Sequence, residues 1–281
     1  MKLASFSQGD KDSYGVVVDD GIVDVGRRLG DRFPTLRGAI AGGALCDIAR
    51  LATEKADLPL TDAKLKPPIP NPDKIVCIGL NYKEHAAEAG AKVPQFPSLF
   101  LRLTNTLVAS GSPLVRPKLS GDFDFEGELA IVIGTAGRHI EKSAALDHVL
   151  GYSCFNDGSI RDFQFKHATA TGKNFVSTGG FGPWIVTREE IPDPSALTLT
   201  TRVNGTQVQH SGVNDLIFDV PSIIAYVSGF TQLLPGDVIA TGTPSGVGFA
   251  RKPPLWLKAG DVVEVEISRI GVLRNPVIAE A

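Results

Sequence analysis

A proline-rich segment divides the chain into two parts. Residues 66–72 read Lys-Pro-Pro-Ile-Pro-Asn-Pro, with four prolines in seven positions. Proline lacks the backbone N–H that a helix or a central strand needs, so neither element can continue through this segment. We therefore expect a small N-terminal domain with its linker over residues 1–70 and a larger domain over residues 71–281.

The N-terminal part has the pattern of a small α/β domain. Two apolar runs, residues 14–18 and 22–25, flank Asp19-Asp20-Gly21, which is a hairpin signal. A helix is expected to follow from about Thr35 to Ala56.

The larger part is predicted to consist mostly of short strands and turns. Apolar runs at residues 75–78, 151–155, 238–240 and 262–267 indicate strands, and Asn204-Gly205 predicts a two-residue hairpin turn. Asn81 is expected to cap a helix over 82–89, and Pro221 to open a helix that ends near 232. Many short strands with few helices predict a β-rich α+β fold rather than a doubly wound parallel sheet.

Composition excludes several classes of protein. The net charge is −3 without long charged runs, so we expect neither nucleic acid nor an anionic membrane as partner. No apolar run approaches the ~20 residues of a membrane span, and the first residues contain no apolar signal core. Three widely spaced cysteines, Cys46, Cys77 and Cys154, predict reduced thiols, and hence a cytoplasmic protein.

Two glutamates at the start of an apolar strand are the best pointer to function. Glu126 and Glu128 are two residues apart, so in a strand they project to one side, where burial and mutual repulsion make a cation favourable. Asp157 follows another predicted strand and supplies a third carboxylate. Three acids without a His or Cys cluster suit Mg²⁺ or Mn²⁺ ahead of zinc. The alternative is the polar face of an edge strand.

Two cationic residues follow the third acid. Arg161 and Gln164 are three apart on a short predicted helix, after Ser159 as its expected cap, and would share one face. Arginine suits a substrate carboxylate, whereas an ion pair with Asp162 is the alternative. Lys173 stands in a segment that lacks phosphate-loop spacing, and it is either buried beside the carboxylates or an exposed loop residue.

A histidine–glutamate pair and a glycine-rich loop complete the candidates. His85 and Glu88 are three apart on the helix after Asn81, so the carboxylate can orient an imidazole that takes a proton. A surface histidine is the alternative. Residues 90–97 behind this helix are predicted to be a mobile lid. Residues 240–248, which include Thr243, fit no nucleotide motif and are expected to bring backbone N–H groups close to a ligand.

Together and in this order, these motifs resemble the fumarylacetoacetate hydrolase family. The resemblance extends from about residue 72 to the C-terminus, while residues 1–70 look like the family's variable N-terminal domain. The matching segments are Gly79-Leu80-Asn81-Tyr82 with His85 and Glu88, Phe125-Glu126-Gly127-Glu128-Leu129, Asn156-Asp157, Arg161-Asp162 with Gln164, Gly172-Lys173-Asn174-Phe175, Gly182-Pro183-Trp184, Val203-Asn204-Gly205, Pro235-Gly236-Asp237 and residues 241–248.

The resemblance implies a mixed β-roll catalytic domain, usually in a homodimer, that acts on a small oxo acid. It implies Mg²⁺ or Mn²⁺, with Ca²⁺ also compatible. By family position, the metal ligands are Glu126, Glu128 and Asp157, the catalytic residues His85, Glu88 and Lys173, and the substrate-binding residues Arg161, Gln164 and Thr243.

The expected reaction is metal-dependent hydrolysis of the C–C bond of a 2,4-dioxo acid, such as fumarylpyruvate or a sugar-derived diketo acid, to pyruvate and a carboxylic acid. In this scheme His85, oriented by Glu88, activates the attacking water. Two alternatives remain. One is a decarboxylase or isomerase of oxo-dioic acids such as oxaloacetate or hydroxymuconate-type compounds, and the other is a ligand-binding protein without activity.

Overall fold

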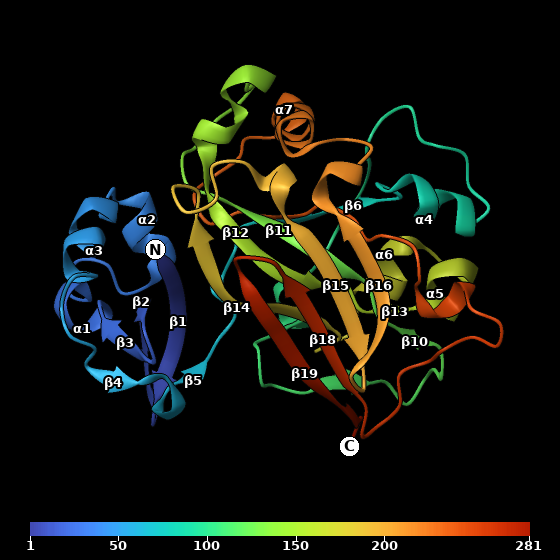
Figure 1. Ribbon diagram of the computed structural model, residues 1–281, viewed down its shortest axis with the longest axis horizontal. Helices are drawn as coiled ribbons and strands as arrows, with labels where there is room; N and C mark the ends of the chain where they lie inside the picture. Colours follow the sequence, from blue (N-terminus) through green and yellow to red (C-terminus); the bar gives the residue numbers. More distant parts are fainter.

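The computed structural model describes residues 1–281 and consists mainly of strands in three sheets (Figure 1). The twelve-stranded sheet has the order β4-β3-β2-β1-β14-β12-β11-β17-β6-β7, with β5 on β1 and β8 on β14. A five-stranded sheet has the order β16-β15-β18-β19-β9, and β10 pairs with β13. Most neighbours are antiparallel, whereas β17 and β6 are parallel, so the large sheet is mixed. The expected β-rich α+β fold is confirmed.

The strands of the large sheet are β1 (Lys2–Gln8), β2 (Lys11–Val18), β3 (Gly21–Asp24), β4 (Leu58–Pro59), β5 (Lys64–Leu65), β6 (Ile75–Gly79), β7 (Ser98–Leu101), β8 (Leu107–Val108), β11 (Gly127–Ile133), β12 (Val149–Asn156), β14 (Gly179–Thr187) and β17 (Val238–Ala240). The smaller sheets contain β9 (Leu114–Arg116), β15 (Thr198–Val203), β16 (Thr206–Gly212), β18 (Val262–Ile267) and β19 (Gly271–Ala279), and β10 (Phe123–Asp124) with β13 (Ser159–Ile160).

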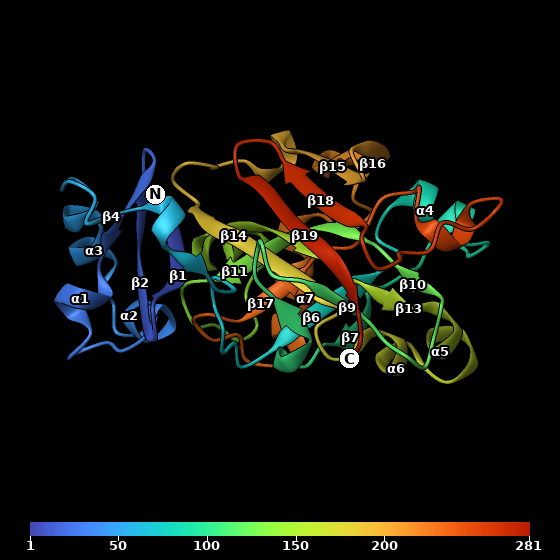
Figure 2. The same cartoon turned by 90° about the horizontal axis from the view of Figure 1, so that it is seen from below.

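The α-helices are short and lie at the periphery of the sheets (Figures 1 and 2). They are α1 (Gly26–Leu29), α2 (Leu36–Ala41), α3 (Leu45–Leu51), α4 (Lys83–Glu88), α5 (Arg161–Lys166), α6 (Thr169–Lys173) and α7 (Val220–Phe230). Short 3₁₀ helices are η1 (Leu60–Asp62), η2 (Thr104–Thr106), η3 (Lys142–His148), η4 (Pro194–Ala196), η5 (Val213–Asp215) and η6 (Gly248–Ala250).

Strand β11 lies at the centre of the large sheet and is buried on both faces. Leu129 and Ile131 point into a core that they share with α7 and the five-stranded sheet. Ala130 and Val132 point into a second core with residues of the N-terminal helices. This two-sided burial explains why the run from Leu129 to Ile133 is apolar without alternation.

The N-terminal residues form the lobe on the left of Figure 1. Strand β1 pairs with β2 on one side and with β14 on the other, where Leu3 lies opposite Ile185. The lobe therefore continues the large sheet and shares a core with it. The domain boundary at residue 70 and the homodimer stay predictions.

Several local predictions are confirmed. In the first hairpin Val18 lies opposite Gly21, so Asp19 and Asp20 form the turn. Val203 lies opposite Thr206 around the Asn204-Gly205 turn.

Three local predictions are wrong. The single helix expected over 35–56 is two helices, because the chain turns at Gly42-Gly43, where Gly43 has φ +74°. Asn81 does not cap α4; its amide bonds the carbonyls of Thr241 and Phe218 instead, at 2.8 and 3.0 Å. Ser159 does not cap α5, since it lies in β13 and donates to the Asp157 carbonyl.

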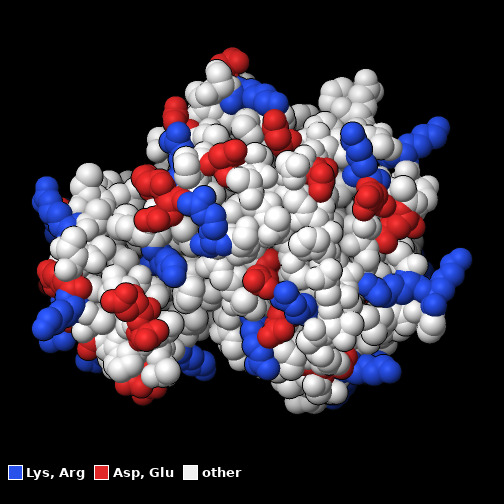
Figure 3. All heavy atoms as spheres, viewed as in Figure 1, with Lys and Arg blue, Asp and Glu red and all other residues white.

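No helix is long and apolar enough to cross a membrane. All three cysteines are free thiols. Basic and acidic side chains are interspersed over the face shown in Figure 3.

Two glycines should respond to alanine with opposite signs. Gly205 in the hairpin turn has φ +78° and Gly229 lies in α7, and an added Cβ meets nothing within 4 Å at either position. Gly205→Ala should cost about 1 kcal/mol because an L-residue is strained in that conformation. Gly229→Ala should raise the free energy of unfolding by as much as about 1 kcal/mol, because alanine has the higher helix propensity. Urea unfolding measures both, and changes of the same sign would contradict the backbone explanation.

Candidate active site

Three buried carboxylates meet where two central strands end. Glu126 immediately precedes β11, Glu128 lies within it, and Asp157 directly follows β12, the antiparallel neighbour. The Asp157 N–H donates to the Glu126 carbonyl at 2.8 Å, which holds the two strand ends together. One carboxylate oxygen from each acid lies within 4.8 Å of the others. Because β11 is a central strand, the edge-strand interpretation of these glutamates is wrong.

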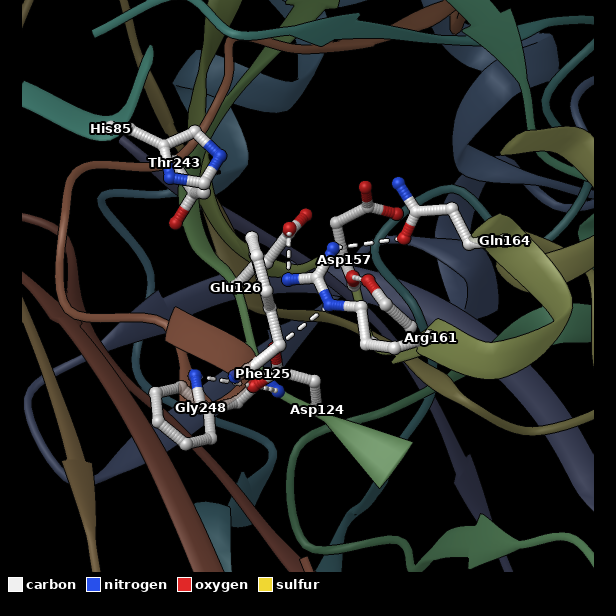
Figure 4. A network of polar contacts seen from close by, with 12 residues as sticks. His85, Asp124, Phe125, Glu126, Asp157, Arg161, Gln164, Thr243 and Gly248 are labelled. Carbon is white, nitrogen blue, oxygen red and sulfur yellow. Dashed lines mark hydrogen bonds and ion pairs between the residues drawn. The ribbon is translucent and has the colours of Figure 1, made fainter. Parts of the chain in front are cut away.

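Three buried cations surround the acids. The Lys173 ammonium bridges Glu126 and Asp157, and Arg102 binds the other Asp157 oxygen. Arg161 donates from Nη2 to Glu126 at 2.6 Å and from Nε to Asp124 at 2.8 Å. Figure 4 shows Arg161 between these carboxylates and Gln164. The alternatives of an exposed Lys173 and an Arg161–Asp162 ion pair are therefore wrong.

Close helix packing places the residues of α5 and α6. An added Cβ at Gly172 would lie only 2.5 Å from the Gln164 Cβ, so glycine is required where the helices touch. The Gln164 side-chain oxygen accepts from Arg161 Nη1 at 2.8 Å. Arg161 and Gln164 therefore share one helix face, as predicted, and Lys173 reaches the acids from the end of α6.

The charges of this cluster do not balance. Asp124, Glu126 and Asp157 each contact at least one cation, whereas Glu128 contacts none and accepts only the Gly242 N–H at 2.8 Å. Burial, reinforced by Asp157 and Glu126, raises the pKa of Glu128 well above its usual value.

The pKa shifts of Glu126 and Lys173 favour the charged form of each group, in contrast to that of Glu128. Burial alone would raise the pKa of Glu126, but Arg161 and Lys173 outweigh burial and lower it. Burial would lower the pKa of Lys173, but Asp157 and Glu126 outweigh it and raise it. Glu126 and Lys173 are thus held as a charged pair.

This donor set fits a hard divalent cation. Three converging carboxylates without thiol or imidazole are the ligands that Mg²⁺ and Mn²⁺ prefer. The acid without a cationic partner, Glu128, is one of the three, and a bound ion would remove its repulsion from Asp157. We therefore assign Glu126, Glu128 and Asp157 as candidate ligands.

A glycine-rich loop, residues 241–249, organises the carboxylates through backbone N–H groups. Gly242 donates to Glu128, Gly246 to Glu88, and Gly248 and Phe249 to Asp124, at 2.7 to 3.1 Å. The sequence predicts that N–H groups and a threonine hydroxyl of this loop lie close to a ligand, whereas in the structure these N–H groups donate to carboxylates of the chain itself.

Thr243 of the same loop has a hydroxyl that is already engaged. It donates to the Gly127 carbonyl at 2.9 Å and accepts from Gln209 at 2.8 Å. Thr243 nevertheless lines the cavity described next.

A cavity of about 270 Å³ contains the site. It is small for a ligand pocket, which suits a small molecule. His85 lies at its wall and is buried, and its Nδ1 is 2.9 Å from Glu88 Oε1, so the surface-histidine interpretation is wrong. The other lining residues from the predicted set are Glu126, Glu128, Asp157, Arg161, Gln164, Lys173 and Thr243, and Phe100, Phe165 and Phe249 supply aromatic walls. Glu88 lies behind His85.

Two buried residues of the cluster were missed in the sequence. Asp124 precedes Glu126 by two residues, so strand alternation could have included it. Arg102 directly follows the apolar strand β7, and only its position after a strand hinted at a site residue. Its guanidinium contacts Asp157, Thr106 and Thr178, which lie far apart in the chain.

Comparisons with known proteins find a matching family model and similar sequences. Residues 74–278 match the family model described as "Fumarylacetoacetate (FAA) hydrolase C-terminal". The chain is 44% identical over 221 residues to the oxaloacetate tautomerase fahd2, mitochondrial, of Xenopus laevis, which covers 78% of this chain and 69% of that protein.

Two solved structures share the whole fold. Maleylpyruvate hydrolase from Sphingobium sp. SYK-6, in complex with manganese(II) and pyruvate, has a TM-score of 0.84 and 31% identity, with complete coverage of both chains. The 2-hydroxyhepta-2,4-diene-1,7-dioate isomerase from Mycobacterium marinum has a TM-score of 0.79 and 31% identity, covering 100% of this chain and 99% of that one.

In metal-free protein, Glu126→Gln and Glu128→Gln should have opposite effects on stability. A raised pKa means that Glu128 stabilises the fold below about pH 4.5 and that this contribution is lost as pH rises through its folded pKa. Between pH 5 and 8, the Glu128→Gln variant should therefore have a higher free energy of unfolding than the wild type. The lowered pKa of Glu126 means that its carboxylate stabilises the fold at neutral pH and that this contribution is lost as pH falls. Glu126→Gln should therefore lower the free energy of unfolding by about 3 kcal/mol at neutral pH and by less in acid. Urea unfolding with a chelator present at each pH measures this, and parallel pH profiles would refute it.

Manganese should stabilise the wild type through Glu128. At a free Mn²⁺ concentration of about 100 times Kd, mass action adds about 2.7 kcal/mol, which raises the melting temperature by several degrees. Glu128→Gln should lose this increase, whereas Glu264→Gln, on the half-exposed strand β18, should keep it. Equal increases in all three proteins, measured by scanning calorimetry, would place the ion elsewhere.

Proposed function

The chain belongs to the fumarylacetoacetate hydrolase family, and from this premise we propose that it catalyses the metal-dependent keto–enol tautomerisation of 2-oxo dicarboxylic acids of the oxaloacetate type. The observation that carries the proposal is one small cavity in which three carboxylates, a lysine, an arginine and a histidine converge. The named relatives support an isomerising reaction more than the hydrolysis of acylpyruvates.

His85 is the proposed carrier of the proton. Its Nδ1 pairs with the Glu88 carboxylate, so the Nδ1–H tautomer is favoured and Nε2 is left as a proton acceptor. Tautomerisation needs one proton removed from C3 and one delivered to the 2-oxygen, and a neutral imidazole can do the first step. Glu88 is itself fixed by the Gly246 N–H, so the imidazole is oriented before substrate arrives.

The remaining cavity residues would hold the substrate. A divalent ion bound by Glu126, Glu128 and Asp157 would withdraw electron density from a chelated 2-oxo carboxylate and so acidify C3. The four carboxylates of the cluster outnumber its three cations by one, so a bound divalent ion would leave a net charge of +1, which favours an anionic substrate. Lys173 and Arg161 supply two of these positive charges at the cavity wall. The free amide nitrogen of Gln164 can donate to a substrate oxygen, since its oxygen is occupied by Arg161.

Hydrolysis of a 2,4-dioxo acid is the second candidate. It would use the same residues, with His85 activating a water rather than removing a proton from C3. The similarity to maleylpyruvate hydrolase supports it. A protein that only binds a ligand is less well supported, because every site residue that the resemblance implies either lines the cavity or, as Glu88 does, pairs with His85 behind it.

Removing the imidazole should abolish most of the activity. His85→Ala should lower kcat by about 10²- to 10⁴-fold, the usual contribution of a general base. The assay follows the loss of enol-oxaloacetate absorbance with Mg²⁺ or Mn²⁺ present, and pyruvate release from acylpyruvates in parallel. His148→Ala is the matched control, because His148 lies on η3 and bonds only the Thr135 carbonyl.

Each outcome of these assays has a definite meaning. Full tautomerase activity after exhaustive chelation would rule out a role for the metal. Unchanged activity in the His85→Ala variant would rule out His85 as the base. Rapid pyruvate release with no acceleration of tautomerisation would overturn the proposal in favour of hydrolysis.

A further inference from the structure

We propose that Asp124 is a positioning residue that fixes Arg161 and Phe249 as one wall of the cavity, and thereby sets the affinity for both metal and oxo acid. Asp124 is fully buried and does not line the cavity, so it acts through other residues. Figure 4 shows it on the side of Arg161 away from Gln164.

The backbone holds Asp124 and Arg161 in register. Asp124 ends β10 and lies opposite Ser159 of β13, and α5 begins with Arg161 directly after β13. The Arg161 N–H also donates to the Asp122 carbonyl at 3.0 Å. The two side chains are therefore brought together by a two-stranded sheet.

All four donors around the Asp124 carboxylate require an acceptor. Oδ1 accepts from the N–H groups of Phe125 and Gly248, at 2.8 and 2.7 Å. Oδ2 accepts from the Phe249 N–H at 3.0 Å and from Arg161 Nε at 2.8 Å. An asparagine amide would turn its NH₂ toward two of these donors whichever way it faced. Only a carboxylate satisfies this position.

These contacts join the two groups that face the cavity. The Phe249 ring lies over the guanidinium, with the Arg161 Cζ 4.5 Å from the ring centroid, and both residues line the cavity. Only glycine allows the loop to approach this closely, because a Cβ at Gly248 would lie 2.5 Å from Asp124 Oδ1 and 2.1 Å from the Leu255 carbonyl. Asp124 thus holds the guanidinium by one edge and, through the Phe249 N–H, fixes the ring on its face.

The charge of Asp124 also weakens the hold of Arg161 on Glu126, which favours metal binding at Glu126. Arg161 divides its charge between Asp124 and Glu126. Without Asp124, the guanidinium would pair with Glu126 alone and compete with a divalent ion for that carboxylate. Groups that orient metal ligands in this way typically change metal affinity by about 10- to 100-fold when they are removed.

The test measures binding rather than turnover. Titration calorimetry of the full chain gives Kd for Mn²⁺ alone, and then for pyruvate at saturating Mn²⁺. Asp124→Asn should weaken both by about 10- to 100-fold. The control Asp162→Asn should change neither, because Asp162 lies on α5 but bonds Ser120 and none of the buried cations. Equal affinities in the two variants would overturn the proposal.

A double variant that removes one negative and one positive charge keeps the test decisive if Asp124→Asn fails to fold. Arg161→Gln and the double variant Asp124→Asn/Arg161→Gln are compared for the same two constants. If Asp124 acts on the site through Arg161, the double variant should match Arg161→Gln within about threefold, the non-additivity of coupled residues. If the double variant binds Mn²⁺ or pyruvate a further tenfold more weakly than Arg161→Gln, Asp124 does not act through Arg161. The choice of pyruvate as a probe rests on the proposed function. Mn²⁺ binding does not, so it tests the inference even if the protein has no tautomerase activity.

Discussion

The pairing of buried carboxylates with buried cations is the interaction on which the site depends. Desolvation of each of these ions costs several kcal/mol unless a partner lies close by. The partners come from separate parts of the chain: Arg102 follows β7, Asp157 follows β12, and Lys173 ends α6. Each ion is satisfied only when the other segments are in place. Assembly of the site and folding of the sheet are therefore one event, and Glu128, which has no cationic partner, is left for an added cation.

The glycine-rich loop turns this cluster into a single unit. It supplies N–H donors to Glu128 among the candidate ligands, to Asp124 behind Arg161 and to Glu88 behind His85. Gly246 has φ +102°, and an added Cβ would lie 2.1 Å from the Val208 carbonyl, so only glycine can make this approach. A shift of the loop would disturb the proposed base and the metal ligands together.

The sequence predicted most of the site because its members follow local rules. Alternation placed Glu126 and Glu128 on one side, helical spacing paired His85 with Glu88, and the order of the motifs indicated the family. Local rules failed where long-range bonds took over. Asn81 and Ser159 have the residue types of helix caps, but their side chains bond distant or preceding carbonyls. Arg102 was missed because its four partners come from three other segments, which no spacing reveals.

For the proposed function, the choice between tautomerisation and hydrolysis would depend on how α4 is held against the cavity. Both reactions use the same carboxylates and the same imidazole, and differ in whether His85 meets the substrate carbon or an intervening water. Helix α4 is fastened to the glycine-rich loop at its C-terminal end by Glu88, which accepts from the Gly246 N–H, and the Asn81 amide, two residues before the helix, donates to the Thr241 carbonyl. These bonds hold the buried imidazole at the wall of a cavity of only about 270 Å³. In the proposed reaction, these bonds would fix the distance from the imidazole to the substrate carbon, and that distance would decide between direct proton transfer and activation of a water.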